Sequence, residues 1–139
     1  MVRADVTGRK IARAATRLHD VEELIAHPVE QFIADDRGRD LASFYLFLAI
    51  QECIDLAAHW VADSGWAPPD DAGSTFDILA QHHAIPRDLA EVMKEAAGLR
   101  NRIGHGYAEL DHARLHVEFR EGAAALRRFL TAVADAASL

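Results

Sequence analysis

The chain has 139 residues, of which 50% are hydrophobic and 27% are charged, and its formal net charge is −7. This length and balance are those of one globular domain, here residues 1–139, and they exclude a disordered or fibrous chain. The acidic excess repels polyanions at long range, which excludes broad non-specific binding to nucleic acid and leaves only a locally basic site for that role.

Cysteine content and the N-terminal sequence together predict an intracellular protein. Cys53 is the one cysteine and cannot form an intrachain disulfide, so nothing requires an oxidising compartment. The N-terminus MVRADVTGRK lacks the apolar run of a signal peptide, and we expect no stretch that approaches the roughly eighteen apolar residues of a membrane span. A cytoplasmic protein with no membrane partner is therefore expected.

Apolar residues recur at intervals of three and four rather than two, which predicts amphipathic helices and an all-α fold. We expect an antiparallel, up-and-down bundle of four to five helices. The first helix should cover about residues 7–27 and end before Pro28, because proline interrupts a helix. A short segment, residues 29–34, then leads into the polar turn DDRGRD. The inner face of the first helix is predicted to contain Ile11, Ala14, Ala15, Leu18, Val21 and Ile25.

A second long helix is predicted from about Asp40 to Ser64. Gly65 and the cluster PPDD that follows shortly after end it, because both are typical of turns. Trp66 is expected to cover the adjacent end of the core. The buried stripe of this helix is predicted to contain Leu41, Phe44, Tyr45, Leu48, Leu56 and Trp60.

Two further helices are predicted before the most unusual segment of the chain. Ser74 and Asp77 have the spacing of a capping box, which predicts a short helix that lasts to His82 or His83. Pro86 can occupy the first turn of the next helix. Its apolar face should contain Leu89, Val92, Met93 and Ala96, and the same period continues to Arg100, Ile103 and Tyr107. The segment that contains Arg100 should therefore face inward or toward a partner.

Asp111 is the predicted N-cap of the last helix, because aspartate can accept a hydrogen bond from the first free backbone N–H groups. This helix should continue to the C-terminus. Its buried face is predicted to contain Leu115, Phe119, Leu126, Phe129, Leu130 and Val133.

Residues 99–107, LRNRIGHGY, combine two arginines, a histidine and a tyrosine with a glycine on each side of the histidine. Each glycine costs about 1 kcal/mol relative to alanine inside a helix, which indicates a purpose other than packing. In a regular helix Arg100 and His105 would lie about 140° apart in projection. Gly104 and Gly106 would allow the helix to bend or end at His105, so that the two side chains could converge on one ligand.

A guanidinium, an imidazole and a phenol without carboxylates suit phosphate chemistry, because arginine binds phosphate bidentately and histidine transfers protons near neutral pH. RNA carries its own nucleophile, the 2′-hydroxyl, so its cleavage needs a base, an acid and a group that stabilises charge on phosphorus. A twofold dimer would supply a second histidine to the same cleft. The structural alternative is that Arg100 and His105 cap carbonyls, that Tyr107 packs in the core and that the glycines stop the helix.

The string RNRIGHGY, residues 100–107, resembles the R-x-x-x-x-H-x-Y signature of the HepT-like proteins of the HEPN superfamily. The segment LAIQECIDLAAHWVADSGWAPPDD also resembles the second helix of that family. Residues 76–107 and the following turn, residues 109–111, resemble the next third of the family's sequence. The likeness covers most of the chain from about Leu41, and the first forty residues match only in helical character.

This resemblance implies a helical-bundle homodimer that acts as a metal-independent ribonuclease, without a cofactor. It also implies the toxin of a toxin–antitoxin module, whose antitoxin is an MNT-type nucleotidyltransferase. By the resemblance, Arg100 and His105 would be the catalytic pair, and Asn101 and Arg102 would support them. Tyr107 would be the residue to which the antitoxin attaches AMP.

Two readings from other classes stay open. One is an interaction protein that binds a nucleotide or a partner enzyme through RNRIGHGY and cuts nothing, with Tyr107 only as an acceptor. The other is a structural helical dimer. A small nucleotidyltransferase encoded beside this chain would favour the toxin module.

For the remaining candidate residues, structural roles are favoured. His112 and His116 are four apart, a spacing that can bind a metal, but no cysteine or paired carboxylate nearby completes a set, so surface histidines are favoured. His82 and His83 end a short helix, where an imidazole complements the helix dipole. Cys53 lies in an apolar helix without an evident base, which favours a small buried hydrophobe over a nucleophile.

Overall fold

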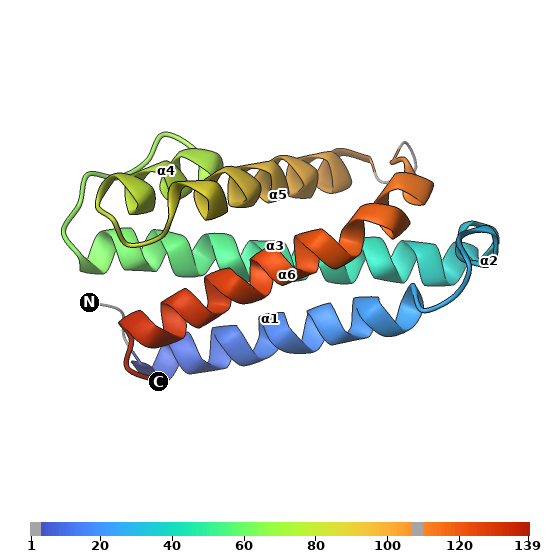
Figure 1. Ribbon diagram of the computed structural model, residues 1–139, viewed down its shortest axis with the longest axis horizontal. Helices are drawn as coiled ribbons and strands as arrows, with labels where there is room; N and C mark the ends of the chain where they lie inside the picture. Colours follow the sequence, from blue (N-terminus) through green and yellow to red (C-terminus); the bar gives the residue numbers. More distant parts are fainter. Residues whose placement is uncertain (1–3, 107–109) are drawn as a thin grey trace.

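Six α-helices form a bundle in the computed structural model, which describes residues 4–106 and 110–139 (Figure 1). The helices are α1 (Ala4–Leu24), α2 (Val29–Ala34), α3 (Asp36–Asp63), α4 (Ala72–Gln81), α5 (Arg87–Gly106) and α6 (His112–Ala136). The four long helices run in alternating directions in chain order, while α2 and α4 are short (Figure 1). The predicted all-α, up-and-down bundle is confirmed, with one helix more than the expected four to five.

Helix α3 lies at the centre of the bundle and packs against all five other helices. Its most extensive packing is with α1, while α5 lies on its other side and α6 crosses it obliquely (Figure 1). Phe76 on α4 packs edge-on against Phe129 on α6, with ring centroids 5.3 Å apart. Both rings are fully buried, so the core joins helices that are distant in sequence.

The sequence predicted no stretch apolar enough to span a membrane, and the composition of α3 corrects this prediction. Within the described part of the chain, α3 is long and apolar enough to cross a membrane by length and composition. Half of this apolar stretch is buried inside the bundle. Contacts with five neighbouring helices account for the buried half, since a central helix must present apolar side chains on several faces.

Helix α3 begins at Asp36, whereas the sequence predicted a polar turn here and a helix start near Asp40. The reason is a local cap: the Asp35 carboxylate accepts a hydrogen bond from the Gly38 backbone N–H at 3.0 Å. Gly38 is buried and lies close to that carboxylate, where a larger residue would collide with it. The polar letters therefore mark a helix N-terminus instead of a loop.

Helix α1 ends at Leu24, three residues before the predicted end. Its buried face contains Ala14, Leu18 and Val21, as predicted, but Ala15 is exposed. The spacing of the buried residues leaves Ala15 beside the stripe instead of in it, because each helical residue advances about 100°.

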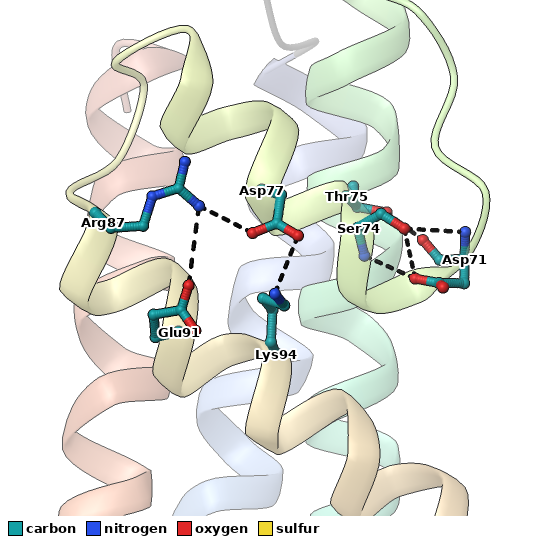
Figure 2. A network of polar contacts seen from close by, with 7 residues as sticks. All are labelled: Asp71, Ser74, Thr75, Asp77, Arg87, Glu91 and Lys94. Carbon is teal, nitrogen blue, oxygen red and sulfur yellow. Dashed lines mark hydrogen bonds and ion pairs between the residues drawn. The ribbon is translucent and has the colours of Figure 1, made fainter.

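A polar network ties α4 to α5 (Figure 2). The α4 capping box pairs Asp71 with Ser74, not Ser74 with Asp77 as predicted: the Asp71 carboxylate accepts from the Ser74 backbone N–H at 2.7 Å. Asp77 instead forms ion pairs with Arg87 at 2.9 Å and Lys94 at 3.1 Å. The hydrogen bond from the Ser74 hydroxyl, followed by that from its backbone N–H, holds the pKa of Asp71 below its ordinary value.

The last helix follows the prediction closely. Asp111 is its N-cap, with a carboxylate that accepts from the Arg114 backbone N–H at 3.0 Å. Its predicted face is buried except for Leu115, which is partly buried. On α5, Leu89 and Met93 are buried as predicted, whereas Val92 is exposed.

Candidate functional site

Four of the five predicted site residues lie on the last two turns of α5. Arg100 is half-buried, while Asn101, Arg102 and His105 are exposed. Ile103 between them is buried and anchors this end of α5 to the core. Tyr107, the fifth residue, lies outside the described residues.

The Arg100 side chain is fixed by a residue of the central helix. Its Nη1 donates a hydrogen bond to Gln51 Oε1 on α3 at 2.6 Å. Gln51 Nε2 in turn donates to Asp55 Oδ1, one turn further along α3, at 2.9 Å. The segment was predicted to face inward or toward a partner: Arg100 is directed toward α3, and the structure supplies a contact, Gln51, that the sequence did not single out.

Within one chain, the structure does not bring Arg100 and His105 together. Helix α5 continues through His105 to Gly106, and neither Gly104 nor Gly106 has a positive φ. Five helical positions separate the two side chains by about 140° around the axis. No hydrogen bond or ion pair joins them among the described residues. The predicted convergence through a bend at the glycines is thus not found.

Gly104 and Gly106 differ in the atoms that surround them. A Cβ atom on Gly104 would stand 3.3 Å from the ring carbon Cε2 of Phe47, so glycine lets α5 approach α3 closely. A Cβ on Gly106 would meet nothing within 4 Å. Gly104 therefore has a packing role beside Phe47, whereas the described residues show none for Gly106.

An exposed apolar stripe on α3 corrects the predicted burial of that helix. Leu41 and Phe44 are 42% and 54% exposed, and Leu48 is partly buried. Steps of three and four residues continue this stripe to Gln51 and Asp55, so all five share one face of α3. The partner of Arg100 therefore lies on the same face as the exposed apolar side chains. Leu56 and Trp60, which complete the predicted stripe, are buried in the core as expected.

The two histidines of the last helix, His112 and His116, are partly buried. His116 Nε2 lies 2.7 Å from the carbonyl oxygen of His27, and its ring packs on Phe32 with centroids 5.4 Å apart. No group of three or more His, Cys, Asp or Glu side chains that could hold a metal ion occurs in residues 4–106 and 110–139.

Cys53 packs in the core, and His82 and His83 lie in the turn that follows α4. Cys53 is fully buried, and burial, with a smaller contribution from the Glu52 charge, raises the pKa of its thiol to about 12. A neutral buried thiol is no nucleophile, as predicted. His82 stacks on Trp66 with ring centroids 4.0 Å apart, and His83 has a φ of 60°.

A helical bundle with an Arg–His segment at the end of its fifth helix is the arrangement that the resemblance to HepT-like proteins implied. The model of the family described as ribonuclease HepT-like matches residues 14–133, and the chain belongs to this family. The match begins within α1, so the likeness extends further toward the N-terminus than the sequence motifs indicated.

Two curated relatives carry nuclease names. The chain is 28% identical over 107 residues to the mRNA nuclease HepT of Shewanella oneidensis, covering 77% of this chain and 80% of the relative. It is 29% identical over 127 residues to a putative RNase of Archaeoglobus fulgidus, covering 91% of this chain and 89% of the relative.

Solved structures share the fold. The tri-AMPylated Shewanella oneidensis HEPN toxin, solved in complex with an MNT antitoxin, superposes with a TM-score of 0.86 at 24% identity, over 93% of this chain and 96% of that one. A toxin–antitoxin structure with AMP-PNP gives a TM-score of 0.84 at 23% identity, over 93% and 98% of the two chains.

Proposed function

We propose that this chain is the toxin of a toxin–antitoxin module and a metal-independent endoribonuclease of the cytoplasm. The observation that carries the proposal is the arrangement at the end of α5: Arg100 is anchored by a neutral amide, and His105 is exposed nearby. The relatives named as nucleases support the same reading. Asn101 and Arg102, both exposed, would add polar contacts to the RNA backbone.

The chemistry needs two proton transfers and one positive charge. One histidine takes the proton of the RNA 2′-hydroxyl while that oxygen attacks the adjacent phosphorus. The bond from phosphorus to the 5′-oxygen breaks, and a second histidine protonates the leaving oxygen. Arg100 stabilises the negative charge that develops on the phosphate oxygens. No metal ion enters these steps.

A homodimer is proposed because one chain offers one His105 and because its Arg100 and His105 do not converge. The stripe made by exposed Leu41 and Phe44 and partly buried Leu48 gives a second copy an apolar surface next to the site. In a twofold dimer the same stripe covers itself, and both copies of α5 approach one cleft. Doubling Arg100 and Arg102 would make that cleft locally basic on a chain of net charge −7.

The proposed antitoxin is an MNT-type nucleotidyltransferase that attaches AMP to Tyr107. The Tyr107 oxygen would attack the α-phosphorus of ATP, and pyrophosphate would leave. The bound AMP would bring a negative phosphate to the place where RNA must bind and would compete for Arg100. Support comes from the fold shared with the tri-AMPylated toxin and from the position of Tyr107 directly after α5.

The proposed function is tested with purified protein, total RNA and EDTA. We expect cleavage that EDTA does not affect and that His105→Ala abolishes. Cleavage that stops in EDTA and returns with added metal would refute the metal-independent mechanism. Intact RNA together with tight nucleotide or partner binding would instead identify a non-catalytic binding dimer.

A further inference from the structure

A chain of polar contacts runs across the bundle from α1 to the site arginine. Lys10 Nζ on α1 lies 3.6 Å from Asp55 Oδ2, Asp55 Oδ1 accepts from Gln51 Nε2, and Gln51 Oε1 accepts from Arg100 Nη1. The contacts of Gln51 with Asp55 and Arg100 are both part-buried. Three helices therefore determine where the Arg100 guanidinium stands.

The residue that holds Arg100 is an amide and not a carboxylate. Among the described residues Arg100 forms no ion pair, and its buried Nε has no hydrogen-bond partner there. A carboxylate at position 51 would cancel the guanidinium charge, whereas the Gln51 carbonyl accepts a hydrogen bond without doing so. The arginine is thereby fixed in place while its full charge stays available to an anion.

Asp55 determines which end of the Gln51 amide meets Arg100. An amide presents a donor on one side and an acceptor on the other, and a carboxylate only accepts. Turning the Gln51 amide around would place its NH₂ group against the guanidinium and its carbonyl against the Asp55 carboxylate. Both contacts would then be repulsive, so Asp55 keeps the carbonyl directed at Arg100.

Glu52, next to Gln51, is engaged away from this chain of contacts. It pairs with Lys10 at 3.3 Å and with Arg13 at 3.2 Å, both on α1. These pairs leave the neutral amide as the group of α3 that contacts Arg100. Glu52 therefore contacts α1, while Gln51 contacts Arg100 on α5.

We propose that Gln51 is a positioning residue of the ribonuclease site. Asp55 orients the Gln51 amide, and Gln51 in turn presents a fully charged Arg100 to the RNA phosphate. This inference rests on the proposed function. It predicts that the identity of residue 51 sets the affinity for phosphate, since a charged replacement of the same size would neutralise Arg100.

The experiment measures binding of a short RNA oligonucleotide by fluorescence anisotropy, in the non-cleaving His105→Ala background. Gln51→Glu keeps the size and the acceptor but adds a negative charge against Arg100, so the dissociation constant should rise about tenfold or more. Gln81→Glu, an exposed site at the end of α4, makes the same charge change and should leave binding within about twofold. Circular dichroism establishes that each variant folds.

The decisive comparison repeats Gln51→Glu after Arg100→Ala. Because residue 51 acts through Arg100, the substitution should then change binding by less than about twofold. An equal loss of binding with and without Arg100, or no loss in either background, overturns the positioning role. RNA binding that does not depend on Arg100 at all would refute the proposed function, and this inference with it.

Discussion

Arg100 and Gln51 are 49 residues apart in the chain, yet Arg100 Nη1 donates to Gln51 Oε1 over 2.6 Å. His105, five positions beyond Arg100, is exposed on the last turn of the same helix. One residue of the proposed catalytic pair is thus built into the packing of α3 against α5, and the other is not. The two should respond differently to substitution.

Arg100→Ala and His105→Ala should each lower the RNA cleavage rate by about 10² to 10⁴. Arg100→Ala should also destabilise the fold by about 1 kcal/mol, because Gln51 loses its partner, whereas His105→Ala should leave stability unchanged. Cleavage of a fluorescent RNA and urea unfolding measure the two effects. His19→Ala, at an exposed histidine on α1, is the control and should cleave at the wild-type rate.

Phe44→Glu should convert the proposed dimer into a monomer, because it places a charge in the exposed stripe of α3. Sedimentation at micromolar concentration measures the change, and helical content should be retained. Val117→Glu is the matched control: Val117 is 73% exposed and lies on α6 instead of α3. Dissociation by Val117→Glu but not by Phe44→Glu would place the interface on α6.

Tyr107→Phe should abolish modification by the proposed nucleotidyltransferase antitoxin and ATP, because it removes the hydroxyl that is proposed to accept AMP. The variant should still cleave RNA after that incubation, whereas the wild-type protein should gain AMP by mass spectrometry and lose activity. Tyr45→Phe, at the other tyrosine of the chain, should be modified like the wild type. A modified wild-type protein that cleaves at full rate would show that inhibition comes from complex formation alone.

Cys53 should be inert to iodoacetamide in the folded protein at pH 8 and react readily in guanidinium chloride. Burial raises the pKa of the thiol to about 12, so the reactive thiolate is scarce and enclosed. Above an ordinary thiol pKa of about 9 the unfolded chain ionises first, and stability should fall as the pH rises. Rapid labelling of the folded chain would contradict the buried position of Cys53.

Asp71→Ala should destabilise α4 at neutral pH and lose its effect in acid. The hydrogen bond from the Ser74 hydroxyl lowers the pKa of Asp71, so the cap stabilises the fold above the ordinary aspartate pKa. That contribution disappears as the pH falls through the lowered value. Thermal unfolding of both proteins across the acid range should show the two curves converging; a constant difference would exclude the ionised cap.

Sequence patterns predicted the bundle because its helix ends follow local rules. Pro28 and Asp111 affect only the backbone a few residues away. The structure confirms that a helix ends before Pro28 and that Asp111 is an N-cap. The cap at Asp35 was missed because its glycine partner, Gly38, is typical of turns, and only tertiary packing shows that this glycine is buried.

The site was predicted only in part, because its geometry depends on contacts between distant residues. The sequence motif singled out Arg100 and His105 as candidates, but their separation around α5 depends on the helix continuing through Gly104. Nothing in the sequence marked Gln51 as a residue of the site, since a polar residue in an amphipathic helix normally faces solvent. Phe44 was assigned to the core because helical spacing marks an apolar face without telling whether the chain itself covers it.

Cleavage by mixed dimers tests the central claim, a ribonuclease site made by two copies of the chain, most directly. Wild-type protein is co-refolded with an equal amount of His105→Ala, and the RNA cleavage rate is compared with that of the same total amount of wild-type protein. If the cleft needs both histidines, the rate should fall to about one quarter, the share of dimers with two intact copies. A rate of about one half would mean that each chain cuts RNA alone and would contradict the shared site.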